Sequence, residues 1–169
     1  MAKENSAFCG FFPLIALKLP YIEGMEKIRP YTELIDTLKG AGLRPTRQRL
    51  ALAKLLYSRG DRHISAEQLH VEAMDAKVSV SLATVYNTLH QFHDAGLLRE
   101  VLVEAGRSYF DTNISDHHHI FYEETGELID IDKETVQFKN LPKLPEGKAI
   151  SRVEVVVHVV DLDEKGKSI

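Results

Sequence analysis

The chain has 169 residues, 44% of them hydrophobic and 27% charged, with a formal net charge of −4. This mixture predicts one ordinary domain or two small ones and argues against a disordered polymer. The acidic balance excludes a uniformly basic nucleic-acid binder, so any DNA-binding surface has to be a local basic patch. The single cysteine, Cys9, excludes an internal disulfide and a cysteine-rich zinc site, and it favours a reducing, cytoplasmic compartment.

Residues 1–28 are predicted to form a variable N-terminal tail. Their apolar run from Phe8 to Leu19 is too short to cross a bilayer and is interrupted by Pro13 and Lys18. We therefore expect no membrane segment, and the lack of a small-residue cleavage motif argues against a secretory signal. Met25 directly precedes the patterned region, which leaves open whether translation starts there.

Residues 29–111 carry the pattern of a winged helix-turn-helix DNA-binding domain. Apolar residues at helical spacing, with capping residues and glycines, predict four helices. They are Tyr31–Ala41, a helix capped by Thr46 that ends near Arg59, one that starts at Ser65, and one from Ser81 to Ala95. Two strand-like runs follow, Leu97–Val103 and Ser108–Asp111, with a glycine-containing turn between them. A winged helix has this order of elements, with helices followed by a hairpin.

Residues 112–169 have a different pattern, which predicts a small α/β dimerisation and sensing domain. Short strands are expected at His118–Tyr122 and Leu128–Ile131, followed by a helix at Lys133–Asn140. The last element, Arg152–Val160, is rich in valine, which predicts a buried strand at a subunit interface. The fold class that follows is α+β, with an N-terminal winged helix-turn-helix joined to this smaller domain.

The helix that starts at Ser81 has the composition of a DNA recognition helix. Its outward face carries side chains suited to base edges, since Asn and Gln pair with adenine and small methyl groups contact thymine. These side chains are Ala83, Thr84, Asn87 and Gln91, with Tyr86 at the edge of the core face. A solvated polar helix face is the alternative interpretation of the same pattern.

Phosphate contacts need positive charge, which the sequence concentrates just before the second helix. The DNA contacts predicted there come from Arg44, Thr46, Arg47 and Arg49. Arg99 and Arg107 in the hairpin are predicted to add to them. Ordinary surface arginines are the alternative.

Three consecutive histidines, His117–His119, point to a metal site. On an extended segment alternate side chains share a face, so the first and third histidines lie on one side of the strand and His118 on the other. Imidazole binds iron, zinc, manganese or nickel, and nearby carboxylates favour iron or manganese. The candidate carboxylates are Asp111, Asp116 and Asp130. His63, in the loop before the third helix, is placed to add a ligand from the first domain.

The other histidines are expected outside this site. His70, His90 and His93 fall on predicted helices, as solvated or packing residues, and His158 is expected to be buried in the last strand. A surface histidine tract without any ligand role is the alternative interpretation of His117–His119.

Four separated motifs resemble the ferric uptake regulator family: AGLRPTRQR from Ala41, HISAE from His63, LATVYNTL from Leu82 and DHHH from Asp116. The resemblance runs from about Pro30 to the C-terminus. The chain lacks CxxC pairs and has a histidine tract. In both respects it resembles the iron response regulators within that family, which sense haem.

The resemblance implies a homodimer that binds a double-stranded DNA operator and controls iron and haem genes. A regulatory divalent metal, Fe²⁺ or Mn²⁺, would lie between the two domains on His63, Asp111, His117, His119 and Asp130. Haem is the second implied cofactor, with His117, His118 and His119 as its site.

Several positions depart from the family pattern. Tyr122 and Thr125 stand where many members have structural zinc cysteines, so no structural zinc is expected, and Asn87 replaces a common arginine, so the target sequence is expected to differ. Cys9 is followed by Gly10 rather than by the proline of a cysteine haem motif. At the family's second metal site, Gln137 and Ser151 align with the ligands that would accompany His118.

Two other functions are alternatives to this one. A peroxide-sensing regulator of the same family has a similar set of ligands, since Asp111 stands where iron sensors often have glutamate. A His/Asp metallohydrolase is disfavoured, because the sequence has no HExxH motif and no nucleophile elbow. The chain is therefore expected not to be an enzyme.

Overall fold

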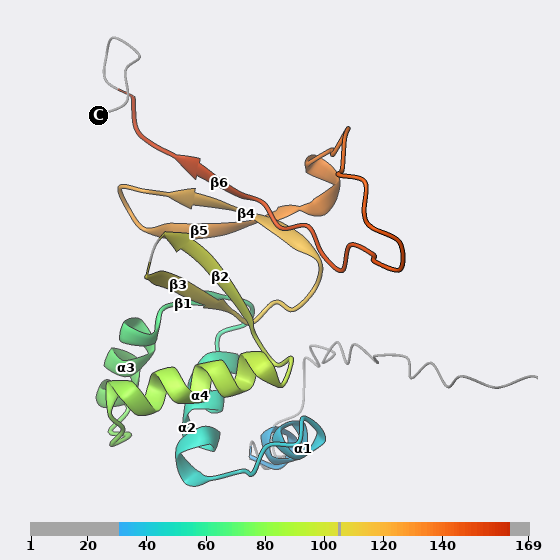
Figure 1. The fold of residues 1–169 in the computed structure, drawn as a ribbon. Helices are drawn as coiled ribbons and strands as arrows, with labels where there is room; N and C mark the ends of the chain where they lie inside the picture. The colour runs from blue at the N-terminus through green and yellow to red at the C-terminus, as the bar shows by residue number, and fades with distance from the viewer. Residues whose placement is uncertain (1–30, 105, 163–169) are drawn as a thin grey trace, which may run out of the picture.

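The structure, a computed structural model, describes residues 31–104 and 106–162. The predicted tail, residues 1–28, lies outside the described residues. The described chain is arranged in three tiers, with the helices at one end, a first sheet in the middle and a second sheet at the other end (Figure 1). Helices and sheets are thus both present, as the predicted α+β class requires.

Four α-helices form the first tier, and each lies within a residue or two of its predicted position. Side-chain caps begin three of them, because Thr46, Ser65 and Ser81 accept hydrogen bonds from backbone N–H groups in the first turn. Ser65 and Gln68 form a complete capping box. The helices are α1 (Thr32–Gly40), α2 (Arg47–Tyr57), α3 (Ala66–Asp75) and α4 (Leu82–Asp94).

The apolar faces of these helices form the larger of two cores. Leu52, Leu89 and Phe92 are fully buried there, and Phe110 from the first sheet closes the core from above. Removal of such side chains from water is the main stabilising effect in folding. Because α4 contributes its apolar face to this core, its opposite face is directed outward.

The first sheet contains β1 (His63–Ile64), β2 (Arg99–Glu104) and β3 (Arg107–Asp111), in the order β1-β3-β2. All of its pairings are antiparallel, and His63 lies opposite Asp111. The hairpin of β2 and β3 confirms the predicted hairpin. The short strand β1 was predicted as a loop, because two residues are too few to show an alternating pattern.

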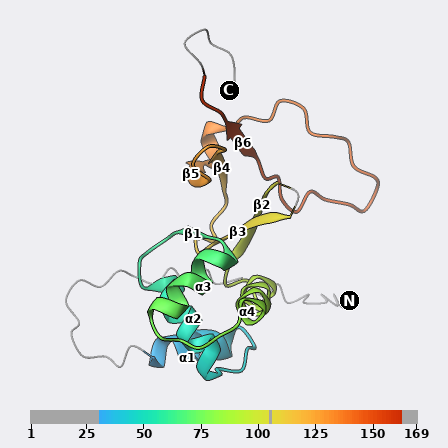
Figure 2. The same cartoon turned by 90° about the vertical axis from the view of Figure 1, so that its left-hand side faces the viewer.

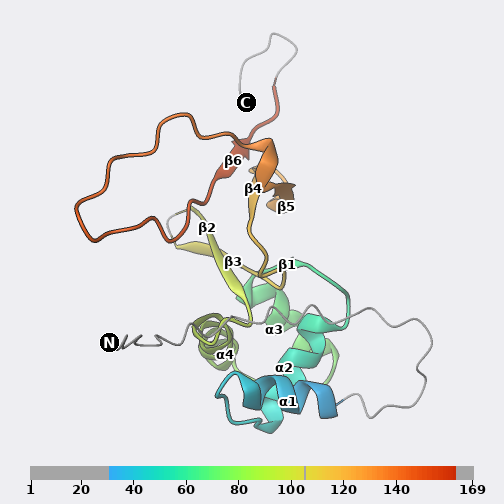
Figure 3. The same ribbon diagram turned by 90° about the vertical axis from the view of Figure 1, so that its right-hand side faces the viewer.

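The second sheet contains β4 (His117–Tyr122), β5 (Glu127–Asp132) and β6 (Val156–Val159), in the order β5-β4-β6. Strands β4 and β5 are antiparallel and place His119 opposite Asp130. Strand β6 runs parallel to β4. The turned views in Figures 2 and 3 show this sheet and the helices at opposite ends, with the chain between β5 and β6 looping out to one side.

Two predictions for the C-terminal region were wrong. The expected helix Lys133–Asn140 is only a 3₁₀ turn, Lys133–Thr135, in which Asp132 caps the N–H of Glu134. Pro142 and Pro145 follow closely, and Phe138 stays exposed, so an extended helix here would have neither a free continuation nor a surface to pack on.

The expected strand Arg152–Val160 is shorter, Val156–Val159, and it is not buried. Val157 is 41% exposed, and His158 is exposed where a buried position was predicted. The reason is that β6 pairs with β4 alone among the described residues and therefore forms an edge of the sheet. Its place in a subunit interface stays a prediction. None of the helices in the described chain is both long and apolar enough to span a membrane.

Candidate metal centre and nucleic-acid interface

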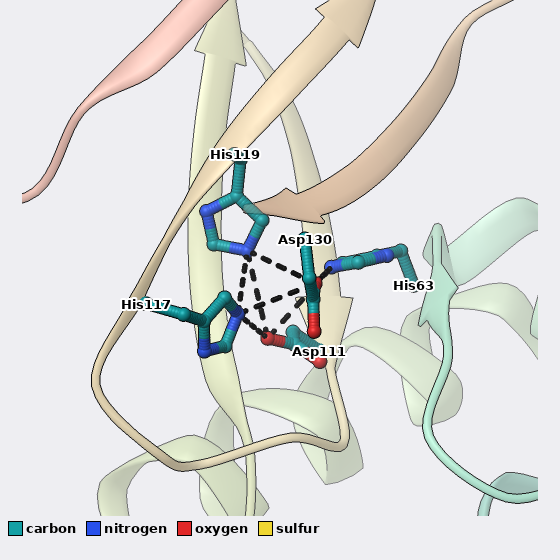
Figure 4. Close-up of side chains that lie close together, drawn as sticks. All are labelled: His63, Asp111, His117, His119 and Asp130. Carbon is teal, nitrogen blue, oxygen red and sulfur yellow. Dashed lines mark hydrogen bonds and ion pairs between the residues drawn. The ribbon is translucent and has the colours of Figure 1, made fainter. Parts of the chain in front are cut away.

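Five side chains with metal-ligand chemistry converge where the two sheets meet. His63 comes from β1 and Asp111 from the end of β3, while the other three belong to the second sheet (Figure 4). One ligand atom from each of the five residues lies within 4.8 Å of every other. They are His63, Asp111, His117, His119 and Asp130, so the structure brings together all five residues named as candidate ligands from the sequence. It is the only such group found among the described residues.

Strand geometry explains why these residues meet. Alternation along β4 puts His117 and His119 on the side of the carboxylates, with ring centroids 4.6 Å apart. His118 points to the other side, where its ring lies 5.7 Å from that of Phe138. The register of each sheet then adds a pair from neighbouring strands, His63 with Asp111 and His119 with Asp130.

The ligand atoms lie close together in one small space. His63 Nε2 lies 2.8 Å from Asp130 Oδ1, and His117 Nε2 lies 3.0 Å from Asp111 Oδ2. Nevertheless His63 Nε2 and Asp111 Oδ2 are buried and have no hydrogen-bond partner. Buried polar atoms without partners are costly, and an ion at their common focus would satisfy both. The donor set therefore fits a metal ion.

The protonation of two members of the cluster, His63 and Asp111, also suits metal binding. Burial lowers the pKa of His63, and this effect outweighs the two nearby carboxylates. For Asp111, burial acts to raise the pKa, but the adjacent His119 ring and the hydrogen bond from the backbone N–H of Asn113 leave it below its ordinary value. Neutral imidazole and ionised carboxylate are the forms that bind metal. Three nitrogens with two carboxylate oxygens suit iron or manganese.

Asn113 supports the two carboxylates and was missed from the sequence. Its backbone N–H donates to Asp111 Oδ1 at 2.7 Å, and its side-chain amide donates to Asp130 Oδ2 at 2.8 Å. Hydrogen bonds of this kind orient the carboxylates that would ligate an ion. No periodic pattern marks Asn113, because it lies in the irregular link between the two sheets. Asp116, a candidate carboxylate from the sequence, is not part of the cluster.

The polar face of α4, predicted to read DNA, is exposed as expected. Val85, Leu89 and Phe92 are buried against the other helices. The opposite face presents Ala83, Tyr86, Asn87 and Gln91 to solvent, with Thr84 half-buried. Tyr86 donates a hydrogen bond to Glu67 of α3. That these side chains contact bases stays a prediction.

Among the basic residues at the start of α2, some side chains are exposed and one is held by hydrogen bonds within the protein. Arg44 and Arg47 are exposed, while Thr46 is exposed and caps α2. Arg49 donates two hydrogen bonds to Gln91 Oε1, at 3.1 and 2.6 Å, and a third to the carbonyl of Arg44. Arg49 thus ties α2 to α4.

Of the two hairpin arginines, Arg99 does not form part of this basic surface, whereas Arg107 is exposed and its contact with phosphate stays a prediction. Arg99 was predicted to contact phosphate, but it is only 5% exposed and hydrogen-bonds to His117 and Glu154. Arg107 lies over the rings of Tyr109 and Phe121, so it contacts the second sheet. The sequence shows charge but not direction, and both residues lie on strands that face the other sheet.

The remaining histidines lie outside the metal cluster. His70 is half-buried and contacts the carbonyl of Val80, while His90 is exposed, 3.6 Å from Glu100. His158 pairs with Glu123. The positions aligned with a second metal site, Gln137 and Ser151, are exposed.

Comparison with known proteins identifies the family. Residues 40–158 match the model of the ferric uptake regulator family. The ferric uptake regulation protein of Vibrio anguillarum is 38% identical over 103 residues, which are 60% of this chain and 69% of that protein.

Two solved structures share this fold. The ferric uptake regulator of Pseudomonas aeruginosa with manganese is 32% identical, with a TM-score of 0.57, over 73% of this chain and 94% of that one. That of Vibrio cholerae is 28% identical, with a TM-score of 0.59, over 75% of this chain and 98% of that one. In this fold an N-terminal winged helix binds DNA and a C-terminal domain dimerises. The chain therefore belongs to the ferric uptake regulator family, whose members are transcription regulators of metal homeostasis and not enzymes.

Proposed function

We propose that this chain is a cytoplasmic, homodimeric regulator of iron and haem genes whose affinity for operator DNA depends on a bound divalent metal, Fe²⁺ or Mn²⁺. The ligands are His63, Asp111, His117, His119 and Asp130. The observation that carries this proposal is the convergence of five ligand atoms from two separate sheets within 4.8 Å. A related regulator, from Pseudomonas aeruginosa, was solved with manganese.

The ligands come from both units of the chain. His63 and Asp111 belong to the sheet that closes the helical core, whereas His117, His119 and Asp130 belong to the second sheet. A bound ion would supply two positive charges, which offset the two carboxylates. With all five side chains engaged, the two sheets keep one relative orientation.

That orientation matters for DNA because a dimer must present two recognition helices together. Half-sites on B-DNA are about 34 Å apart, one turn of the duplex. In the proposed mechanism, residues 29–111 form the DNA-binding domain and residues 112–169 the dimerisation and sensing domain. The angle between these domains then sets the spacing of the two copies of α4, and metal binding and DNA binding favour each other reciprocally.

Haem is the second cofactor that we propose, at His117, His118 and His119. His118 supports this, because it is buried on the face of β4 away from the metal cluster and its Nδ1 atom has no hydrogen-bond partner. Haem that engages His117 or His119 competes with the metal for the same rings. We therefore expect haem to weaken DNA binding.

A peroxide sensor is the alternative function. Its support is the donor set itself, three histidines and two aspartates. Peroxide treatment of the iron-loaded protein distinguishes the two. Addition of oxygen to His63 or His117, seen as a mass increase, would favour the peroxide sensor.

The test of the main proposal is binding to the promoter of an iron-related gene, titrated separately with Mn²⁺ and with haem. Two variants from the same strand make the comparison. We expect His119→Ala to lose the Mn²⁺ dependence, because its ring is fully buried in the cluster. We expect His118→Ala to keep the Mn²⁺ dependence and to lose part of the response to haem.

Equal Mn²⁺ dependence in wild type and His119→Ala would contradict the metal site. DNA binding that haem does not change in the wild type would contradict the haem proposal alone.

A further inference from the structure

Arg99, the first residue of β2, is a buried arginine that contacts the proposed metal centre without being a ligand. Its side chain has four terminal N–H bonds, and each has one acceptor. One nitrogen donates to the carbonyl of Ser115 and, at 3.0 Å, to His117 Nδ1. The other donates to the carbonyl of His117 at 3.3 Å and to Glu154 Oε1 at 2.8 Å. These four contacts fix the position of the guanidinium, while its Nε atom is buried and has no hydrogen-bond partner.

The contact with His117 restricts the form of that ring. Arg99 can only donate, so a hydrogen bond between the two requires a lone pair on His117 Nδ1. A neutral imidazole has one N–H, which must then be on Nε2. His117 Nε2 lies 3.0 Å from His119 Nε2. In this form the Nε2 atom has no lone pair to offer a metal.

The metal-binding form of the ring is the opposite one. When Nε2 carries the lone pair, Nδ1 carries the hydrogen and donates to the carbonyl of Ser115, 2.9 Å away. The N–H of Arg99 then faces another N–H and loses its acceptor. Hydrogen bonds from a charged donor are roughly twice as strong as those between neutral groups. The form bonded to Arg99 is therefore favoured while no metal is bound.

We propose that Arg99 is a positioning residue that holds His117 in the form unable to bind metal, so that filling the site requires breaking the Arg99–His117 hydrogen bond. This inference rests on the proposed metal site. The exchange moves one proton within the ring and changes no net charge. It sets the metal concentration at which the site fills.

Glu154 extends this effect to the second sheet. It is the carboxylate paired with Arg99, and it lies two residues before β6, which runs parallel to the histidine strand β4. When metal removes one acceptor of Arg99, the guanidinium must readjust against Glu154. The state of the metal site is in this way linked to the edge strand of the second sheet.

The test is the position of the proton on His117 in the full-length protein labelled with ¹⁵N-histidine. Long-range ¹⁵N–¹H NMR spectra distinguish a protonated from an unprotonated ring nitrogen, and a His117→Gln spectrum assigns the signals. Zn²⁺ is the metal used, because it is diamagnetic. We expect Nε2–H in the metal-free protein and Nδ1–H with Zn²⁺.

The wild-type spectra alone can overturn the inference, so it does not depend on any variant that might misfold. A metal-free His117 that already carries its proton on Nδ1 contradicts it, even if Zn²⁺ binds normally. Zn²⁺ that leaves the His117 signals unmoved contradicts the proposed metal site, whatever the metal-free form.

Two variants test the role of Arg99 directly. Arg99→Met keeps much of the side-chain length but removes all donors, and we expect at least half of the metal-free His117 rings to change to Nδ1–H. Arg107→Met is the matched control, since Arg107 contacts Tyr109 and Phe121 and not His117. An unchanged ring form in folded Arg99→Met would overturn the proposal.

Glu154→Gln provides a milder change, because Arg99 stays but loses its ionic partner. We expect a partial shift toward Nδ1–H. Glu123→Gln is its control. Glu123 pairs with His158, a residue of β6, and does not contact Arg99. Equal shifts of the His117 ring form in the two variants would show that Glu154 has no part in holding it.

Discussion

The interior of the helical unit and the joint, the region where the two sheets meet, are both buried, but their buried side chains are of opposite kinds. The core of the helices is apolar, with Leu52, Leu89 and Phe92 fully excluded from solvent. At the joint the buried side chains are charged or polar, among them Arg99, Asp111 and His119. Apolar burial stabilises a fold under most solution conditions, whereas buried polar atoms depend on their partners. The helical unit should therefore be insensitive to metal, and the joint should respond to it.

The largest effect expected is from truncation of the apolar core. Phe92→Ala should lower the free energy of unfolding by about 3–5 kcal/mol, because it deletes a fully buried ring and leaves a cavity. Thermal and urea unfolding measure this. Val71→Ala on α3, where the side chain is 59% exposed, should change stability by less than about 0.5 kcal/mol. A smaller difference in stability between wild type and Phe92→Ala with Mn²⁺ than without it would break the separation of the two regions.

Substitution of a metal-binding residue should remove the extra stability that metal gives to the joint. At a Mn²⁺ concentration 100 times the dissociation constant, the wild type should gain about 2.7 kcal/mol of stability. His119→Ala should lose this gain, because its ring belongs to the cluster. His90→Ala, an exposed histidine outside the cluster, should keep it. Unfolding curves with and without Mn²⁺ give both results, and equal gains in the two variants would refute the expectation.

Substitutions on the outer face of the helical unit should change DNA binding without changing metal binding. Asn87→Ala should weaken specific DNA binding by about 1–3 kcal/mol if its amide reads a base edge. Arg47→Ala should weaken binding to all sequences and reduce the slope of log affinity against log salt by about 1. Titrations over a range of salt separate these effects. A change in Mn²⁺ affinity in either variant would mean that the two regions are coupled in the free protein.

A smaller effect is expected at the contact between α2 and α4. Gln91→Ala removes the acceptor of two hydrogen bonds from Arg49 and should cost about 1 kcal/mol in urea unfolding. Arg49→Met should cost a similar amount, and the double variant should cost no more than either one. Additive losses would show that the pair does not act as a unit.

The smallest effect concerns pH. The hydrogen bond from the Tyr86 hydroxyl lowers the pKa of Glu67, so the folded state favours the ionised carboxylate. The stability it contributes is present above the ordinary carboxyl pKa and is lost as the pH falls through the lowered value. Because the pair is exposed, this is less than about 0.5 kcal/mol. Glu67→Gln and Tyr86→Phe should each abolish this part of the acid dependence of unfolding, and a dependence that both variants retain must come from other groups.

Much of the helical unit could be predicted from local sequence. Its helices are marked by apolar residues at helical spacing and by the caps Thr46, Ser65 and Ser81, which act within one turn of the chain. The outward face of α4 follows from the same periodicity. Alternation along an extended strand likewise separated His117 and His119 from His118. These features depend only on neighbours in the sequence.

Tertiary structure decided the features that depend on distant partners. Arg99 could be a phosphate contact by charge alone, and only the approach of the second sheet buries it beside His117 and Glu154. Asn113 has no pattern that marks it, yet it orients both carboxylates. The stretch from Lys133 to Asn140 has helical composition but lacks a surface to pack on, and β6 lacks a second neighbour. Periodicity thus determined where helices and strands begin and which faces they bury, whereas the direction of charged side chains and the fate of marginal elements depended on which parts of the chain come together.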